Sequence, residues 1–158
     1  MGRFIPVSFS LLVLFLSLSG TGADFECPPE WSSYDLHCYK AFDKPKRSRD
    51  AEKFCTEQAK GGHLASIESS EEGDFVAQLL SKVTEKHITH FWIGLRIVDK
   101  EQHCRSEWSD GSSVSYDNLH KRESRKCFAL EKETGYRTWF HMYCADSYPF
   151  VCKVPPYC

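Results

Sequence analysis

Cysteine is the residue type with the most distinctive chemistry in this chain of 158 residues, which contains eight of them. A zinc site built from thiolates requires closely spaced pairs, and no Cys-x-x-Cys occurs in the sequence. We therefore expect disulfides, although the sequence alone allows on the order of a hundred complete pairings. The eight cysteines are Cys27, Cys38, Cys55, Cys104, Cys127, Cys144, Cys152 and Cys158.

The other reactive side chains lack a catalytic arrangement. His87 and His90 stand three residues apart, a spacing that can place two imidazoles on one helix face for a metal. No third ligand accompanies them, so surface histidines are the favoured interpretation. Neither Gly-x-Ser-x-Gly nor His-Glu-x-x-His occurs. We predict that the chain is not an enzyme and needs no cofactor.

The overall charge is close to neutral, but two local runs are basic. The chain has 20 Lys and Arg against 22 Asp and Glu, which argues against binding to nucleic acid. Each basic run is interpreted either as a solvated loop or as a contact to an acidic receptor surface. One run comprises Lys121, Arg122, Arg125 and Lys126, and the other comprises Lys44, Lys46, Arg47 and Arg49.

The N-terminal sequence has the pattern of a secretory signal peptide. Arg3 precedes a short apolar stretch, which is followed by small residues up to Ala23. The apolar stretch is too short to span a bilayer, so a retained membrane anchor is disfavoured. We expect a signal peptide at 1–23, a single domain at 24–158, secretion to the extracellular space and no membrane insertion.

Two helices are predicted in the first half of this domain. The first begins with Ser48 as N-cap, carries apolar residues at helical spacing, and ends at Gly61 and Gly62. The second begins with a capping box formed by Ser69 and Glu72. Its apolar stripe, which we expect to face the core, comprises Phe75, Val76, Leu79, Leu80 and Val83.

Short strands are predicted around and after the helices, which indicates an α+β domain. The polar stretch between Leu95 and Cys127 has little regular pattern and contains the turn signal Asp110-Gly111. Such a stretch within a compact domain is usually functional or engaged with a partner. The expected strands are 38–42, 63–67, 91–95, 127–130, 138–140 and 150–152.

Four segments stand in the order found in C-type lectins. They are Trp92-Ile93-Gly94-Leu95, Trp108-Ser109-Asp110-Gly111-Ser112, Trp139 five residues before Cys144, and Phe150-Val151-Cys152. The sequence resembles still more closely the snake-venom C-type-lectin-like proteins, or snaclecs, especially α subunits of the flavocetin and convulxin kind. This second resemblance rests on residues 94–97, 100–104 and 155–158. It implies a disulfide-stapled C-type lectin-like domain with two helices, short antiparallel sheets and a long exchanged loop.

The resemblance also implies a role for each cysteine. Within the chain it pairs Cys27 with Cys38, Cys55 with Cys152, and Cys127 with Cys144. In the family, a cysteine at the position of Cys104 links the chain to a homologous β chain. Cys158 resembles the terminal cysteine that joins one heterodimer to the next in a ring. A Cys104–Cys158 bridge within one chain, or two free thiols, is the alternative.

The calcium chemistry of the family is expected to be lost. The acidic-proline-amide tripeptide that binds sugar is missing, and Phe140 and His141 stand where Asn and Asp would be ligands. A second family site uses one Ser and three Glu. Ser66, Glu68 and Glu72 match three of them, but the fourth position is Lys153. We expect Lys153 to exclude calcium and pair with the carboxylates, and a helix-capping role for Glu72 is equally compatible.

The function implied by the resemblance is binding without calcium-dependent recognition of sugar. We expect a venom toxin subunit that binds a platelet surface receptor, glycoprotein Ib or glycoprotein VI, as part of a disulfide-linked αβ oligomer. Platelet aggregation and haemostasis would be altered. Two other functions are an anticoagulant that binds a domain of a clotting factor, and a sugar-binding lectin.

Overall fold

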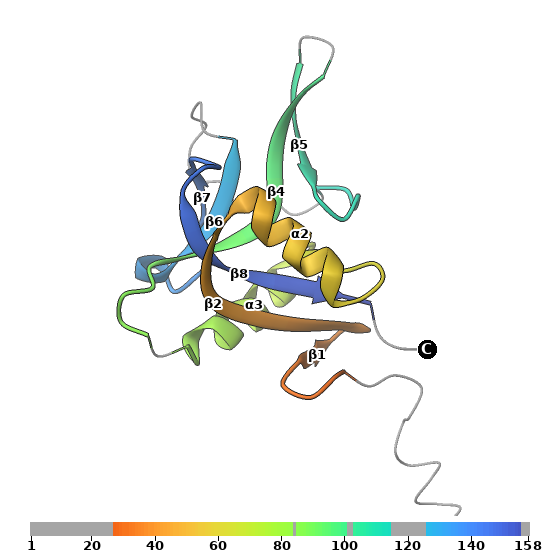
Figure 1. The fold of residues 1–158 in the computed structure, drawn as a ribbon, viewed down its shortest axis with the longest axis vertical. Helices are drawn as coiled ribbons and strands as arrows, with labels where there is room; N and C mark the ends of the chain where they lie inside the picture. The colour runs from red at the N-terminus through yellow and green to blue at the C-terminus, as the bar shows by residue number, and fades with distance from the viewer. Residues whose placement is uncertain (1–26, 84, 101–102, 115–125, 156–158) are drawn as a thin grey trace, which may run out of the picture.

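The computed structural model describes residues 27–83, 85–100, 103–114 and 126–155. Within them, two α-helices and one short 3-10 helix accompany a single sheet (Figure 1). The helices are α2 (Ser48–Gln58), α3 (Ser70–Ser81) and η1 (Lys132–Thr134). The strands are β1 (Ser32–Tyr34), β2 (His37–Arg47), β3 (His63–Leu64), β4 (His90–Lys100), β5 (His103–Trp108), β6 (Cys127–Glu131), β7 (Trp139–Met142) and β8 (Ser147–Val154). The predicted α+β class is confirmed.

The strands form one mixed sheet of eight strands in the order β1-β2-β8-β4-β6-β7, with β3 on β8 and β5 on β4. Short antiparallel sheets were expected from the sequence. The pairs are antiparallel except for β4 with β8, which lie parallel where Trp92 faces Phe150. This single parallel contact joins the N-terminal strands to the late strands, so the sheet is continuous across the domain.

An extended hairpin occupies much of the stretch for which no regular structure was predicted. Strands β4 and β5 pair from Leu95 and Trp108 out to Lys100 and His103. Figure 1 shows the far part of the hairpin projecting away from the rest of the molecule. Within the described ranges, β5 pairs with β4 alone. We call the described residues of this projecting part, 96–100 and 103–107, the arm.

Helix α2 starts differently from the prediction. Ser48 was expected to be the N-cap, but it is the first helical residue, and Arg47 takes the N-cap position without a side-chain cap bond. The reason is a tertiary contact, because the Ser48 N–H donates to the Cys144 carbonyl at 3.3 Å. The helix ends at Gln58, a few residues before Gly61, which has a φ of +81°. A glycine suits this left-handed backbone.

Helix α3 begins as the sequence predicts. The Ser69 hydroxyl accepts a hydrogen bond from the Glu72 N–H at 3.0 Å. Of the predicted apolar stripe, Val76 and Leu80 are buried. Phe75, Leu79 and Val83 are partly buried against the same core. Burial of this face supplies most of the stability of a short helix, because isolated helices of this length are marginal in water.

The core is divided into two clusters by the alternation of side chains along the central strands. On β4, Phe91 and Ile93 join the cluster that packs on α3, whereas Trp92 joins the cluster that packs on α2. On β8, Val151 and Phe150 are divided in the same way. Successive strand residues point to opposite faces, so each helix covers one face of the sheet.

Three disulfides staple these elements. Cys27–Cys38 closes the N-terminal segment onto β2, Cys55–Cys152 joins α2 to β8, and Cys127–Cys144 joins β6 to the turn after β7. These are the pairs that the family resemblance implies. Cys55 and Cys152 are fully buried between helix and sheet.

We predict that the Cys55–Cys152 bond contributes more to stability than the Cys127–Cys144 bond. The first spans 97 residues and the second 17. Loss of a cross-link restores more entropy to the unfolded chain when the closed loop is longer. The pair Cys55→Ala and Cys152→Ala should lower the free energy of unfolding by about 4–5 kcal/mol, against about 3 kcal/mol for Cys127→Ala and Cys144→Ala. Urea unfolding measures both, and an equal or reversed ranking would contradict this assignment.

Candidate functional site

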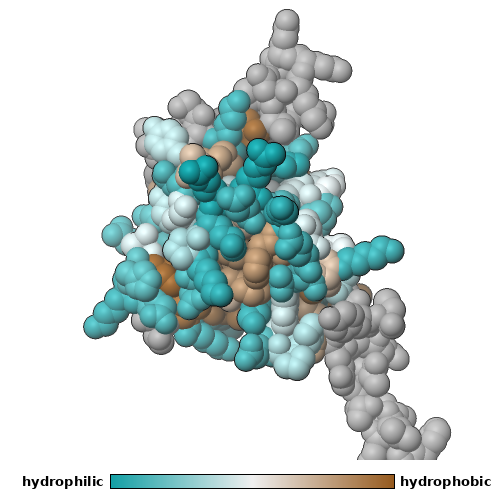
Figure 2. All heavy atoms as spheres, viewed as in Figure 1, coloured by the Kyte–Doolittle hydropathy of each residue, from teal (hydrophilic) through white to brown (hydrophobic). Residues whose placement is uncertain are grey.

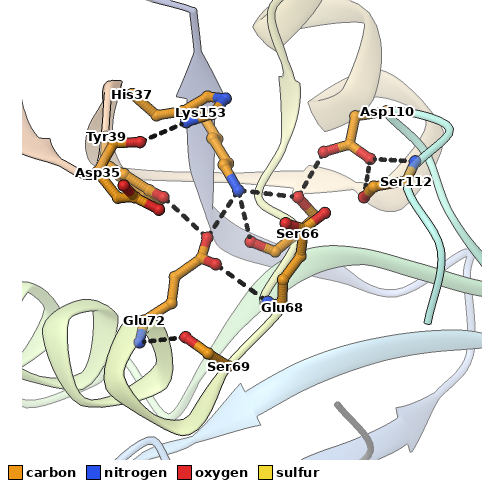
Figure 3. A network of polar contacts seen from close by, with 10 residues as sticks. All are labelled: Asp35, His37, Tyr39, Ser66, Glu68, Ser69, Glu72, Asp110, Ser112 and Lys153. Carbon is orange, nitrogen blue, oxygen red and sulfur yellow. Dashed lines mark hydrogen bonds and ion pairs between the residues drawn. The ribbon is translucent and has the colours of Figure 1, made fainter. Parts of the chain in front are cut away.

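The most unusual feature inside the domain is a buried lysine. Strand β8 carries Lys153 to a position where only 7% of the residue is exposed. Its Nζ donates to Glu72 Oε1 at 2.7 Å, to the Ser66 Oγ at 3.1 Å and to the Ser66 carbonyl at 3.3 Å (Figure 3). An ammonium group has three donors, so its hydrogen-bonding capacity is used completely. A buried charge needs such pairing to be tolerated.

The Glu72 carboxylate is the anionic partner, and it is 5% exposed. Oε1 accepts from Lys153 and from the Tyr39 hydroxyl at 2.8 Å, while Oε2 accepts from the Glu68 N–H at 3.0 Å. The predicted capping box is therefore only half formed. Ser69 caps the helix, but the Glu72 side chain turns to Lys153, Tyr39 and Glu68 because the buried ammonium requires a counter-charge.

Tyr39 closes the cluster from strand β2. Burial, and after it the charge of the Glu72 carboxylate that accepts its hydrogen bond, raise the pKa of the Tyr39 phenol far above its usual value. The hydroxyl therefore remains a hydrogen-bond donor throughout the physiological range. Lys153 Nζ also lies 5.5 Å from the centre of the Tyr39 ring, which allows a cation–π contribution.

Asp110 extends the cluster to the segment that follows the arm. Its carboxylate accepts hydrogen bonds from the Ser66 hydroxyl and from the Ser112 hydroxyl and N–H, the last at 2.8 Å. Burial alone raises the pKa of Asp110, but the hydrogen bonds from Ser112 and Ser66, with a contribution from Lys153, bring it below the usual value. The ionised carboxylate thus stabilises the folded state, and this contribution is lost as the pH falls through the folded-state pKa.

The sequence identified part of this cluster and missed part of it. Ser66, Glu72 and Lys153 come together through their side chains, whereas Glu68 contributes its backbone N–H and its side chain is exposed. Tyr39 and Asp110 were not predicted, because their partners are distant in the sequence. The oxygen atoms of Ser66 and Glu72 that would bind a divalent cation instead accept hydrogen bonds from the Lys153 ammonium, so the geometry is that of a buried ion pair.

His141, one of the two residues at positions where the family resemblance implies calcium ligands, is packed inside the domain. His141 on β7 is 6% exposed, and its ring centre lies 4.4 Å from that of Phe128. Trp139 packs edge-on against Trp108 with ring centres 5.2 Å apart. An imidazole packed against an aromatic ring supplies none of the oxygen ligands that calcium prefers.

The remaining predicted site residues are mostly at the surface or outside the described part of the chain. Cys104 lies on β5, where its backbone faces Asp99. Lys126 is exposed, and the other members of its basic run, Lys121, Arg122 and Arg125, lie outside the described residues, as does Cys158. Among the residues that the structure describes, no group of three His, Cys, Asp or Glu is placed to hold a metal ion.

Over the same residues, no helix has both the length and the apolar character needed to cross a membrane.

Comparison with known proteins assigns the family. The Lectin C-type domain model matches residues 44–154. A snaclec from Macrovipera lebetinus, coagulation factor X-activating enzyme light chain 2, is 68% identical over 158 residues, and the match covers 100% of both chains. The chain is a snaclec. Another snaclec, alboaggregin-D subunit alpha from Trimeresurus albolabris, is 62% identical with complete coverage of both chains.

Solved structures give the same result. The snake venom toxin convulxin matches with a TM-score of 0.68 and 52% identity, covering 84% of this snaclec and 100% of the convulxin chain. Human lithostathine matches with a TM-score of 0.76 and 31% identity, covering 82% of this chain and 99% of its own. Snaclecs are non-enzymatic binding proteins with a C-type lectin-like fold, so this chain is a toxin of that kind. The predicted family and fold are confirmed.

The ion pair predicts a strongly non-additive response to mutation. Lys153→Met leaves Glu72 buried without its counter-charge, which should cost about 3–5 kcal/mol of unfolding free energy. Adding Glu72→Gln removes the stranded charge and should recover more than half of that loss. Urea unfolding of the single and double variants measures the coupling. The exposed Lys132→Met is the matched control, and a similar small loss for Lys153→Met would show that the pair is not essential.

Proposed function

We propose that this snaclec is one subunit of a disulfide-linked heteromer whose assembled surface binds a platelet membrane glycoprotein, Ib or VI. Binding alters platelet aggregation and haemostasis and requires no calcium-dependent recognition of sugar. Residues 1–23 are a signal peptide and 24–158 are the secreted mature chain. The observation that carries the proposal is the arm formed by β4 and β5.

The outer part of the arm favours assembly because, beyond Ile97 and within the described ranges, β4 and β5 pair only with each other. A two-stranded hairpin is at best marginally stable in water on its own. Strand β5 also leaves one edge unpaired within the described ranges, and such an edge offers backbone donors and acceptors to another chain. A homologous β chain that packs on the arm would satisfy both requirements. Cys104, on β5, would then form the bond between the chains.

Cys158 would join one αβ pair to the next. Repetition of a binding surface raises the apparent affinity through effective concentration, and it allows receptors to be cross-linked. The names of related chains support multichain assembly, since one is called a light chain and another a subunit alpha. A Cys104–Cys158 bridge within the chain is the arrangement that this proposal excludes.

Relatives also support a cell-surface target. The rhodocetin structure contains an integrin α2-A domain, and EMS16 is an antagonist of the collagen receptor integrin α2β1. These chains are 51% and 49% identical to this one. The packed imidazole of His141 gives no support to the alternative of a sugar-binding lectin.

A second function is favoured by one specific finding. Light chain 2 of the factor X-activating enzyme from Macrovipera lebetinus is 68% identical to this chain, and its counterpart from Daboia siamensis is 65% identical, both over 158 residues. By this likeness, the chain would be a light chain that binds a clotting factor and directs a separate catalytic chain to it. This differs from the anticoagulant considered from the sequence, although both functions recognise a clotting factor.

One experiment separates these functions. The native complex is purified, its mass is measured with and without reductant, and it is tested for capture of platelet membrane proteins and for activation of factor X. Our proposal predicts a large disulfide-linked assembly of snaclec chains that captures a platelet glycoprotein. Co-purification of a protease with factor X activation, and without platelet capture, would instead establish the second function.

The two unassigned cysteines should have separable effects. Cys104→Ser should abolish the covalent αβ dimer on non-reducing gels, although packing on the arm can preserve a noncovalent pair. Cys158→Ser should leave αβ pairs intact but reduce the large assembly to single pairs and lower platelet-clustering potency, because avidity is lost. Sedimentation and aggregometry on the same preparations provide the measurement. A disulfide-linked αβ dimer that survives Cys104→Ser, or a large assembly that is unchanged in Cys158→Ser, would show that the corresponding cysteine is wrongly assigned.

A further inference from the structure

The second basic run of the sequence surrounds the start of α2 on the surface of the domain. Lys44, Arg47, Arg49 and Lys53 are exposed, and Lys46 is half-buried with its Nζ 5.4 Å from the centre of the Phe54 ring. The pairing register of β2 with β8 shifts between Phe42 and Lys46, within this run. We call Lys44, Lys46, Arg47, Arg49 and Lys53 the basic strip.

The fold brings the remaining described member of the other basic run next to this strip. The Ser48 N–H donates to the Cys144 carbonyl, and Cys144 is bonded to Cys127. Lys126 directly precedes Cys127, and its carbonyl accepts the Ile97 N–H at 2.9 Å at the root of the arm. Lys126 and the strip, separated by more than 70 positions in the sequence, are therefore linked through the same disulfide.

The cations of the strip have no anionic partner among the described residues. The ion pairs there involve other cations, namely Lys40, His63, Arg96, Arg137 and Lys153. Nearby Glu52 accepts the Leu64 N–H at 2.8 Å and lies against His63, so its carboxylate is engaged elsewhere. This concentration of unpaired positive charge stands in a chain whose formal net charge is −2.

The strip also borders a hollow in the surface. Lys46, Arg47 and Lys53 line a groove of about 470 Å³ together with Pro45, Phe54 and Ser147. Figure 2 shows that the side chains over this face of α2 are mainly hydrophilic around a small apolar area. The groove offers a partner both charge and some apolar contact.

We propose that the basic strip, with Lys126, binds an acidic segment of a partner polypeptide. This inference rests on the proposed function, and it gives the receptor-binding surface a location and a chemistry. Unpaired Arg and Lys steer an acidic partner to the surface and pair with its carboxylates, mainly increasing the rate of association and the specificity. Because Lys126 lies at the root of the arm, the bound segment would lie next to the arm, on which we propose that the β chain packs.

A polypeptide fits this groove better than a sulfated polysaccharide does. Two carboxylates, Asp50 and Glu57, line the groove among its cations. A uniformly anionic chain would be repelled by both of them. An acidic peptide can place apolar or neutral residues there and direct its carboxylates to the cations.

The test uses the assembled complex with three variants of this subunit. The strip variant is Arg47→Gln with Arg49→Gln and Lys53→Gln, and the matched control is Lys60→Gln with Lys82→Gln and Lys132→Gln, which removes the same charge at other exposed positions. Arg47→Lys with Arg49→Lys retains the charge. The probes are a labelled Asp/Glu peptide, a neutral Asn/Gln peptide of equal length and a heparin oligosaccharide.

We expect the strip variant to bind the acidic peptide about tenfold more weakly than the control does, because three exposed ion pairs contribute modestly. The variant with Arg47→Lys and Arg49→Lys should retain most of the peptide binding. Added salt should weaken peptide binding to this variant and to the control. Equal peptide affinity in the strip and control variants would overturn the inference. Tighter binding of heparin through the same residues would overturn the choice of a polypeptide partner.

Platelet capture by the same three complexes distinguishes this inference from the proposed function. Capture by the control that is lost in the strip variant supports both. Capture that is equal in the two variants supports the proposed function and overturns the role of the strip in it. Capture by none of the complexes, with strip-dependent peptide binding, overturns the platelet function while retaining an acidic-peptide site.

Discussion

The ion pair between Lys153 and Glu72 is the interaction on which the rest of this structure depends. Calcium requires six to eight oxygen ligands, whereas an ammonium is satisfied by three acceptors, which Ser66 and Glu72 supply here. The Lys153 ammonium group therefore lies where the family resemblance implies the fourth carboxylate of a calcium site. It joins strand β8, the start of α3 and, through Ser66, the segment around Asp110. We infer that this connection between β8, α3 and the segment around Asp110 forms without calcium.

The close packing at the root of the arm supports the proposal that the domain acts as a binding subunit through the arm. The root of the arm is held closely, since the Gly94 N–H donates to the Ala65 carbonyl and the Ser109 N–H donates to the Gly94 carbonyl, both at 2.9 Å. A Cβ at Gly94 would lie 2.8 Å from the Leu64 backbone carbonyl oxygen, which cannot move aside as a side chain can, so glycine is required at this crossing. The domain positions the arm, and a second chain is expected to complete it.

Local signals predicted the helices well, and distant partners explain what was missed. The Ser69 cap and the α3 stripe depend on residues within one turn or two, so the sequence contains their full cause. The start of α2 was misplaced because Cys144, nearly a hundred residues away, binds the Ser48 N–H. The arm was missed because its strands are polar. The role of Asp110 was missed because its partner, Ser66, lies 44 residues earlier. The disulfide pairs followed from family resemblance, since the spacing of the cysteines leaves many pairings open.

The most direct test of the account is whether calcium has any effect on the folded domain. Titration calorimetry with millimolar calcium should detect no saturable binding to the wild-type chain, and its thermal unfolding midpoint should be the same in calcium and in chelator. Lys153→Glu, which replaces the ammonium with a fourth carboxylate, should acquire calcium binding and a midpoint that rises with calcium. Saturable calcium binding by the wild-type chain, or a calcium-dependent rise in its midpoint, would contradict the claim that Lys153 takes the place of the metal.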